Sequence, residues 1–150
     1  MENLLKISGS VEETRRSGKQ LAHDIRGYSR NIFLFGELGA GKTTFLKGLG
    51  EGLGIEEDIT SQTFQLVRRY ENTGGNGFIH VDLYRLKDID EILHLGWWDI
   101  LEDEAVTAVE WADRAFEILP EEGVFLKIRM LSEKEREIGI YRKKEDLPRD

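Results

Sequence analysis

The residues from Gly36 to Thr43 form the strongest chemical motif of the sequence. They read Gly-Glu-Leu-Gly-Ala-Gly-Lys-Thr, which matches G-x-x-x-x-G-K-[ST], and they directly follow the apolar run 32–35. Glycines let successive backbone N–H groups turn towards phosphate oxygens, while the lysine reaches the outer phosphates and the threonine hydroxyl binds Mg²⁺. The motif therefore predicts a phosphate-binding loop for a nucleoside triphosphate.

Acidic residues follow two other apolar runs in the same way. Asp82 comes directly after 78–81, and Glu110 comes directly after 106–109. Ligands of open α/β sheets collect at the carboxyl ends of strands, so we expect Asp82 to be the second protein ligand of Mg²⁺ beside Thr43. Glu110 has two credible roles, activating the attacking water or holding Mg²⁺ through water. The structural alternatives are a turn or helix cap for Asp82 and an ion pair with Lys or Arg for Glu110.

Four further side chains carry two interpretations each. Thr63, in the loop 61–64, either senses the γ-phosphate or starts a strand through a simple hydrogen bond. His80 shares a strand face with the acidic strand end, but it is favoured as a core histidine because no metal-ligand spacing surrounds it. Arg85 either meets transition-state charge or forms an ordinary salt bridge, and Trp111 either stacks on a ligand or packs.

The elements that must position these residues follow from hydrophobic periodicity, caps and turns. A capping-box signal at Ser10-Val11-Glu12-Glu13 predicts a helix start, and the turn-rich segment 71–77 predicts an antiparallel hairpin between its flanking strands. We expect strands over 4–8, 32–35, 64–70, 78–81, 106–109, 124–130 and 137–141, and helices from Ser10 to the vicinity of Ile25, from the phosphate loop to the glycines of 48–54, and over 89–95. This order predicts a three-layer α/β sandwich with a mixed parallel and antiparallel sheet, typical of phosphate-loop NTPases.

The composition sets the class of protein. The 150 residues include no cysteine, and we expect one domain over 1–150, with a charged tail from Arg142 to Asp150 that frays. No apolar stretch approaches membrane-spanning length, so a cytoplasmic protein without membrane attachment is expected. The net charge of -8 disfavours a direct grip on nucleic acid, because binding a phosphate backbone needs clustered Lys and Arg.

Four motifs, in order and spacing, resemble the TsaE family. They are 36–45, Ser-Gln-Thr-Phe at 61–64, His-Val-Asp-Leu-Tyr-Arg-Leu at 80–86 and Val-Glu-Trp at 109–111, and the resemblance runs from about Ser10 to Met130. Members of this family are small bacterial ATPases that act with the TsaB and TsaD proteins to make N6-threonylcarbamoyladenosine beside the tRNA anticodon. The resemblance implies ATP, Mg²⁺ and these two partners, with tRNA reached only indirectly through the complex.

The resemblance also assigns roles to residues of this chain. It gives the metal to Thr43 and Asp82, and the metal or the hydrolytic water to Glu110. Catalysis is expected from Glu110, Lys42 and Thr63, and nucleotide binding from Glu37, Leu38, Gly39, Ala40, Gly41, Lys42, Thr43, Thr44, Thr14 and Arg136. One position departs from the family, which usually has proline where this chain has Gln62, so the stiffness of that loop is in doubt.

Other functions fit parts of the pattern. ATP occupancy can set partner affinity in a binding module in which hydrolysis is incidental. A phosphate loop also serves small-molecule kinases, although no arginine-rich lid segment follows here. A GTPase fits less well, because the sequence after Asp82 lacks the glycine of that class and no Asn-Lys-x-Asp motif occurs.

Overall fold

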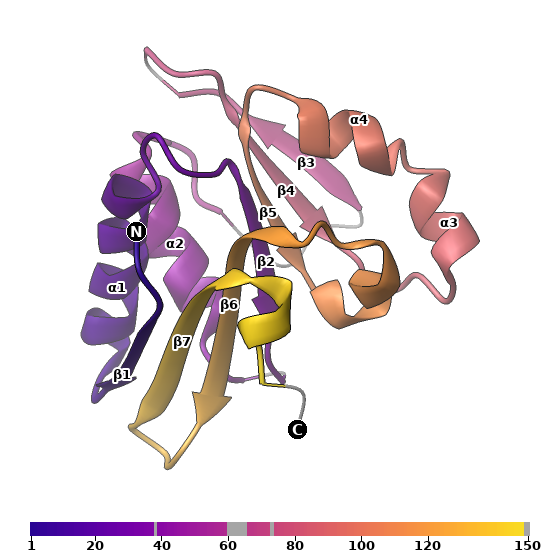
Figure 1. The fold of residues 1–150 in the computed structure, drawn as a ribbon. Coiled ribbons are helices and arrows are strands. Elements are labelled where there is room, and N and C mark those ends of the chain that lie inside the picture. The colour runs from indigo at the N-terminus through magenta and orange to yellow at the C-terminus, as the bar shows by residue number, and fades with distance from the viewer. Residues whose placement is uncertain (38, 60–65, 73, 149–150) are drawn as a thin grey trace.

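The computed structural model describes residues 1–37, 39–59, 66–72 and 74–148. Within these residues, seven strands form one sheet in the order β1-β7-β6-β2-β5-β4-β3 (Figure 1). The strands are β1 (Leu4–Ser8), β2 (Asn31–Phe35), β3 (Val67–Tyr70), β4 (Phe78–Asp82), β5 (Val106–Glu110), β6 (Glu122–Met130) and β7 (Arg136–Lys143).

The sheet is mixed, as the sequence predicts. β6, β2, β5 and β4 run parallel in its centre, while β7 and β1 on one side and β3 on the other are antiparallel to their neighbours. Parallel strands end at the same edge of a sheet, and the register pairs Asp82 directly with Glu110. The topology therefore brings the two acidic strand ends side by side.

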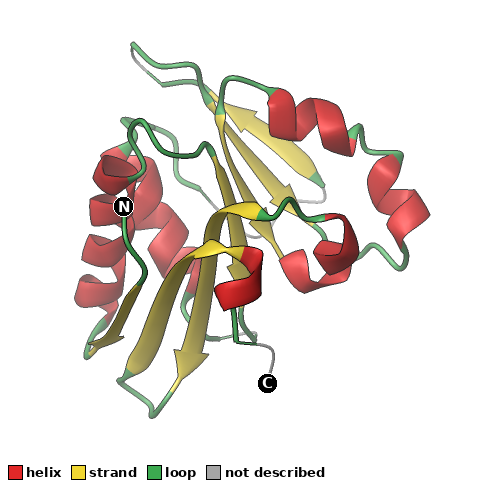
Figure 2. Cartoon of the chain, in the orientation of Figure 1, coloured by secondary structure: helices red, strands yellow, loops and turns green. Residues whose placement is uncertain are grey.

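Helices cover both faces of the sheet (Figure 2). α1 (Val11–Asp24) and α2 (Lys42–Gly52) pack on one face, around a core that includes Ile32, Leu34 and Phe45. α3 (Ile89–Leu93), α4 (Trp97–Glu102) and the 3₁₀ helix η1 (Ala112–Ile118) contribute to the core of the other face, with Phe33 and Trp97. The predicted three-layer sandwich is confirmed. Among the described residues, none of the helices combines the length and the apolar character needed to span a membrane.

The capping signal at Ser10 starts α1 as predicted. The Ser10 hydroxyl accepts from the Glu13 backbone N–H at 3.1 Å, and the Glu13 carboxylate reaches back to the Gly9 N–H at 2.7 Å. The first bond satisfies a donor that the helix start leaves unpaired, and the second holds the residue before the cap. The helix ends at Asp24 with Ile25 as its cap, where the sequence places the end.

Two glycines bring α1 and α2 close together. A Cβ on Gly18 would lie 2.0 Å from the carbonyl oxygen of Phe45, and a Cβ on Gly48 would lie 1.8 Å from that of Arg15. No side chain fits at either position, so the two helices pack with their backbones nearly in contact. This contact holds α2, and with it the phosphate loop, against the rest of its layer.

Two predicted elements differ from the structure. The helix expected over 89–95 ends at Leu93, and the separate helix α4 follows after Gly96, whose φ of 82° turns the chain. β3 begins at Val67, and positions 64 and 65 of its predicted range lie outside the described residues.

The prediction of a frayed tail is wrong for residues 142–148. Arg142 and Lys143 belong to β7, and the short 3₁₀ helix η2 (Lys144–Asp146) follows. Leu147 is buried in the core of the second face, and the Lys144 ammonium donates to the Leu119 carbonyl oxygen at 3.1 Å. The buried apolar side chain and this hydrogen bond together hold the segment against the fold.

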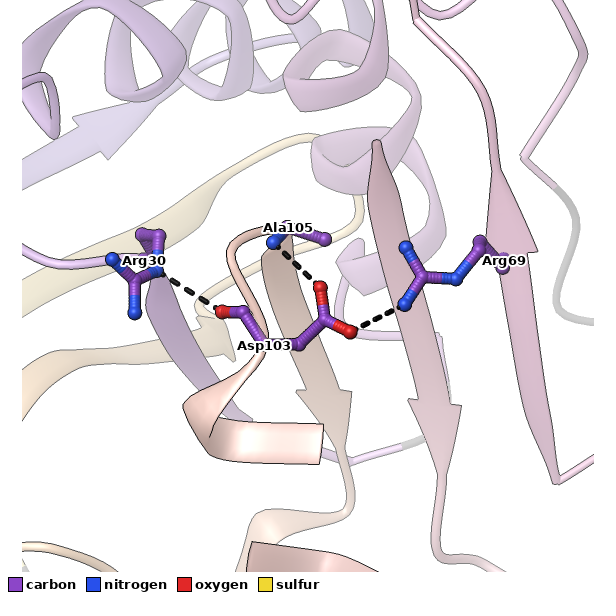
Figure 3. Close-up of polar contacts among 4 residues, drawn as sticks. All are labelled: Arg30, Arg69, Asp103 and Ala105. Atoms are coloured by element: carbon purple, nitrogen blue, oxygen red, sulfur yellow. Dashed lines mark hydrogen bonds and ion pairs between the residues drawn. The ribbon is translucent and has the colours of Figure 1, made fainter. Parts of the chain in front are cut away.

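Asp103 ties three parts of the fold together just before β5 (Figure 3). One carboxylate oxygen accepts from the Ala105 N–H at 2.9 Å, and the other accepts from Arg69 of β3 at 2.5 Å. The Asp103 carbonyl oxygen accepts from Arg30 at 3.1 Å, directly before β2. The Ala105 N–H and then the Arg69 guanidinium favour the charged carboxylate, so they lower the pKa of Asp103.

Candidate functional site

The phosphate loop runs from the end of β2 into the first turn of α2. Gly41 precedes the helix with a φ of 106°, a left-handed conformation that favours glycine, so the loop requires its glycine there. Lys42 and Thr43 therefore occupy the first turn of an 11-residue helix. Its N–H groups and dipole present positive potential at this end, which suits an anion.

Lys42 lies inside the protein. The residue is only 5% exposed, and its Nζ atom donates to the Gly36 carbonyl oxygen at 2.6 Å. The same ammonium lies 3.9 Å from the centroid of the Trp111 ring. Burial lowers the pKa of Lys42, and the nearby carboxylates of Glu110, Asp113 and Asp82 partly offset this effect.

The two acidic strand ends differ in their surroundings. Asp82 is partly exposed, and Oδ1 accepts from the Tyr84 N–H at 3.0 Å. Glu110 is 4% exposed, and Oε2 lies 2.7 Å from Nε2 of His80, which is also buried. The partner of Glu110 is thus a histidine of β4, and the sequence interpretation of His80 as a satisfied core histidine agrees with its burial.

A pocket of about 800 Å³ opens over these residues. Three separate parts of the chain line it, namely the start of α1, the phosphate loop with the strand ends, and the turn between β6 and β7. It brings together most of the predicted site residues: Thr14, Gly39, Gly41, Lys42, Thr43, Thr44, Asp82, Glu110 and Arg136. Leu38 and Thr63 lie outside the described residues.

Two loop residues predicted to bind nucleotide lie outside this lining. The Ala40 N–H donates to the Glu37 carbonyl oxygen at 3.1 Å, so it closes a turn within the loop. The Glu37 side chain lines a neighbouring cavity of about 540 Å³, which shares Tyr84 and Trp111 with the main pocket. Glu37 is exposed, whereas Ala40 is buried in the core beneath the loop.

Thr14 and Arg136 border the phosphate loop from the two flanking segments. The buried Thr14 hydroxyl lies 2.8 Å from the Ser8 hydroxyl, which anchors α1 to β1. Arg136 Nη2 donates to the Gly39 carbonyl oxygen at 3.3 Å, and Nη1 donates to the Ser132 carbonyl oxygen at 2.9 Å. The guanidinium therefore joins the β6–β7 turn to the phosphate loop.

Trp111 marks a strained point at the end of β5. Its φ of 57° is the one positive φ among the described non-glycine residues, a conformation that clusters at functional sites. The ring lies 5.0 Å from that of Tyr84, centroid to centroid. Sequence reasoning missed Tyr84 and Asp113. Tyr84 comes two residues after Asp82, and this short distance could have indicated that it lies near the site. The position of Asp113 depends on the turn into η1, which the sequence does not reveal.

The residues present fit a magnesium ion. Thr43, Asp82 and Glu110 line one pocket and offer hydroxyl and carboxylate oxygens, the ligands that Mg²⁺ prefers. Among the described residues, no group of three or more His, Cys, Asp or Glu side chains forms a metal cage.

The fold and the site define a class. A glycine-rich loop between a parallel strand and a helix N-terminus, with acidic residues at neighbouring strand ends, is the arrangement of the phosphate-loop α/β proteins. The family model "Threonylcarbamoyl adenosine biosynthesis protein TsaE" matches residues 8–138. The chain belongs to the TsaE family, which takes part in tRNA threonylcarbamoyladenosine biosynthesis.

Individual relatives agree with this assignment. The tRNA threonylcarbamoyladenosine biosynthesis protein TsaE of Treponema pallidum (strain Nichols) is 37% identical over 134 residues, covering 89% of this chain and 97% of the relative. The TsaE protein of Aquifex aeolicus (strain VF5) is 38% identical over 139 residues, covering 91% and 95%. The crystal structure of Bacillus subtilis YdiB superposes with a TM-score of 0.69 at 33% identity, covering 95% of this chain and 86% of that one. The family and the fold class expected from the sequence are confirmed.

Proposed function

We propose that this chain is a Mg²⁺-dependent ATPase that serves the threonylcarbamoylation of tRNA. The observation that carries the proposal is the meeting of Lys42, Asp82 and Glu110 in one pocket at the N-terminus of α2. A phosphate-binding cation, an acidic metal ligand and a second carboxylate are the groups that phosphoryl transfer to water requires.

Each residue has a distinct role in this proposal. Lys42 exchanges the Gly36 carbonyl oxygen for the outer phosphates, whose charge raises its pKa again. Thr43 and Asp82 would hold Mg²⁺, which would supply positive charge to neutralise the phosphates. Glu110 orients the attacking water, whose oxygen bonds to the γ-phosphorus as the bond to the bridging oxygen breaks, giving ADP and phosphate.

Membership of the TsaE family supports a proposal for the cellular setting. We propose that the chain works in the cytoplasm with TsaB and TsaD proteins and reaches tRNA only through them. The net charge of -8 supports an indirect role, since a direct grip on RNA needs clustered positive charge. The internal contact of Lys42 supports weak turnover in the isolated chain, because Nζ must leave the Gly36 carbonyl oxygen before it can bind a phosphate.

The test measures phosphate release with ATP and Mg²⁺, with and without the two partners. We expect Lys42→Ala and Glu110→Gln each to lower turnover by about 10²-fold or more, the usual scale for losing one group that stabilises the transition state. Glu117→Gln, an exposed carboxylate of η1, is the matched control and retains wild-type turnover. Wild-type turnover in both site variants would refute the site assignment.

A nucleotide-dependent binding module is the second candidate. Several separate chain segments line the pocket, so a bound nucleotide would hold them together and alter the outer surface whether or not it is hydrolysed. Glu110→Gln separates the two functions. If this variant binds ATP, does not hydrolyse it and still supports repeated cycles of tRNA modification, the binding module is the better description.

A further inference from the structure

His80 is a buried polar residue to which the proposed function gives no role. It is 4% exposed and lies on β4, two residues before Asp82 on the same face of the sheet. Its Nε2 atom lies 2.7 Å from Oε2 of Glu110, the carboxylate proposed to orient water. An ionised carboxylate only accepts hydrogen bonds, so Nε2 carries the proton and donates.

The strand register makes this contact possible. His80 is the register partner of Ala108, while Glu110 is the partner of Asp82, so the histidine and the glutamate meet on a diagonal between β4 and β5. Ala108 has only a methyl group, which leaves room for the two longer side chains to touch. Both partners stand on regular, hydrogen-bonded strands, so the sheet fixes the backbone positions from which the two side chains extend.

We propose that His80 is a positioning residue for ATP hydrolysis. By binding Oε2 it fixes the rotamer of Glu110, so that Oε1 faces the pocket and meets the attacking water. A carboxylate oriented by a second side chain needs no rearrangement when charge develops in the transition state. This inference rests on the proposed function, because it assigns Glu110 a role in hydrolysis.

Two substitutions separate positioning from simple packing. His80→Gln keeps an N–H donor at about the reach of Nε2, whereas the shorter side chain of His80→Asn withdraws it. We expect His80→Asn to lower kcat by roughly 10–100-fold, the usual effect of removing a group that orients an active-site residue. KM for ATP changes little, because the contact of His80 is with Glu110. His80→Gln restores kcat to within about fivefold of wild type, on the same reasoning.

A merely structural role predicts another pattern. Both substitutions would then lower kcat in proportion to their loss of thermal stability, with no rescue by Gln. Melting temperature and ATP affinity are therefore measured for each variant, and His80→Leu replaces His80→Asn if the latter does not fold. Equal loss in the donor and non-donor variants overturns the proposal.

A double-mutant cycle tests whether His80 acts through Glu110. In the Glu110→Gln background, His80→Asn should cause no further loss of kcat, because the oriented carboxylate is already gone. Full additivity of the two losses overturns the proposal. If Glu110→Gln alone hydrolyses ATP at the wild-type rate, the proposed function fails; if it is inactive while His80→Asn is fully active, only the positioning role fails.

Discussion

Lys42 is held by the protein itself, between the Gly36 carbonyl oxygen and the ring of Trp111. Its buried position lowers its pKa, and the three nearby carboxylates only partly compensate. A bound polyphosphate would bring further negative charge close to this ammonium and favour its charged form. The proposed nucleotide binding would therefore be coupled to the charge state of Lys42.

Replacement of Lys42 tests this coupling. With ATP and Mg²⁺ at 100 times the dissociation constant, binding stabilises the native state by about 2.7 kcal/mol. For a chain of this length this corresponds to a rise in melting temperature of roughly 5–10 °C. Lys42→Met should lose most of this rise, whereas Lys47→Met on the same helix should keep it. Differential scanning fluorimetry measures both, and an undiminished rise in Lys42→Met would contradict the assignment.

Asp103 gives the fold a defined response to acid. The pKa of this carboxyl is lower in the folded chain than its ordinary value of 3.8, because the Ala105 N–H and Arg69 favour the charged form. A carboxyl group whose pKa is lower in the folded state contributes its full stabilisation at pH values above its unfolded-state pKa. This stabilisation is lost as the pH falls through the folded-state pKa.

Asp103→Asn should therefore lower the melting temperature at pH 6, and the difference from wild type should shrink as the pH falls below about 3.8. Thermal unfolding followed by circular dichroism between pH 3 and 7 measures this difference. Glu104→Gln, at the exposed neighbouring position, removes the same charge and serves as control. If the difference in melting temperature stayed constant over the whole pH range, the carboxylate charge would not contribute to the stabilisation by Asp103.

The sequence predicted the residues that directly follow strands. Lys42, Asp82 and Glu110 could be placed together because the carboxyl ends of neighbouring parallel strands share one edge. The contact of Glu110 with His80 could not be foreseen, because it depends on the register between β4 and β5. Asp113 was missed for a similar reason, since the left-handed backbone of Trp111 decides where η1 begins.

At the scale of elements, the contact between α1 and α2 places the strictest requirement on residue size, because it needs glycine at two positions. The sequence suggested that the glycines of 48–54 stop α2, and the helix does end at Gly52. Gly48, however, lies within the helix and permits close approach to α1. A single sequence cannot distinguish these two uses of glycine, because the second depends on the neighbouring helix.

Gly48→Ala tests the close approach. The added Cβ would lie 1.8 Å from the Arg15 carbonyl oxygen, so the helices must separate. We expect a loss of about 1–3 kcal/mol in the free energy of unfolding, despite the better helix propensity of alanine. Gly9→Ala, where the nearest atom is 3.7 Å away, is the control. Urea unfolding measures both, and a Gly48→Ala variant as stable as wild type would show that the helices can move apart freely.

The elements missed from the sequence are short. α4 has six residues, and the pattern Trp97-Trp98-Asp99-Ile100 is too brief to separate a helix from a buried strand. The tail was wrongly predicted to fray because most of its residues are charged, whereas the residue that packs is the single apolar Leu147. The longer elements, by contrast, were predicted to within a few residues of their bounds.

At the scale of the whole molecule, the pocket joins distant parts of the sequence. Gly9 and Thr14 line it from the β1–α1 region, and Lys134 and Arg136 line it from the β6–β7 turn. Arg136 already connects that turn to the phosphate loop. A ligand in the pocket should therefore stabilise both flanking segments together.

Hydrogen exchange tests this connection. ATP and Mg²⁺ should slow amide exchange severalfold in the start of α1, the first turn of α2 and the β6–β7 turn, because a bound ligand suppresses local opening. Amides of α3 and α4, on the other face of the sheet, should change little. The Lys42→Met variant, measured under the same conditions, should show none of this protection. Protection confined to the phosphate loop would show that the flanking segments are not part of the ligand site.

The pairing of β1 with β7 has a consequence for the protein during its synthesis. Ser8 pairs in register with Arg136, so β1 finds its neighbour only after β7 has left the ribosome, more than a hundred residues later in the sequence. The phosphate loop emerges early, but the wall that Arg136 contributes to its pocket arrives last. A growing chain thus cannot complete the lining of the pocket before Arg136 has emerged.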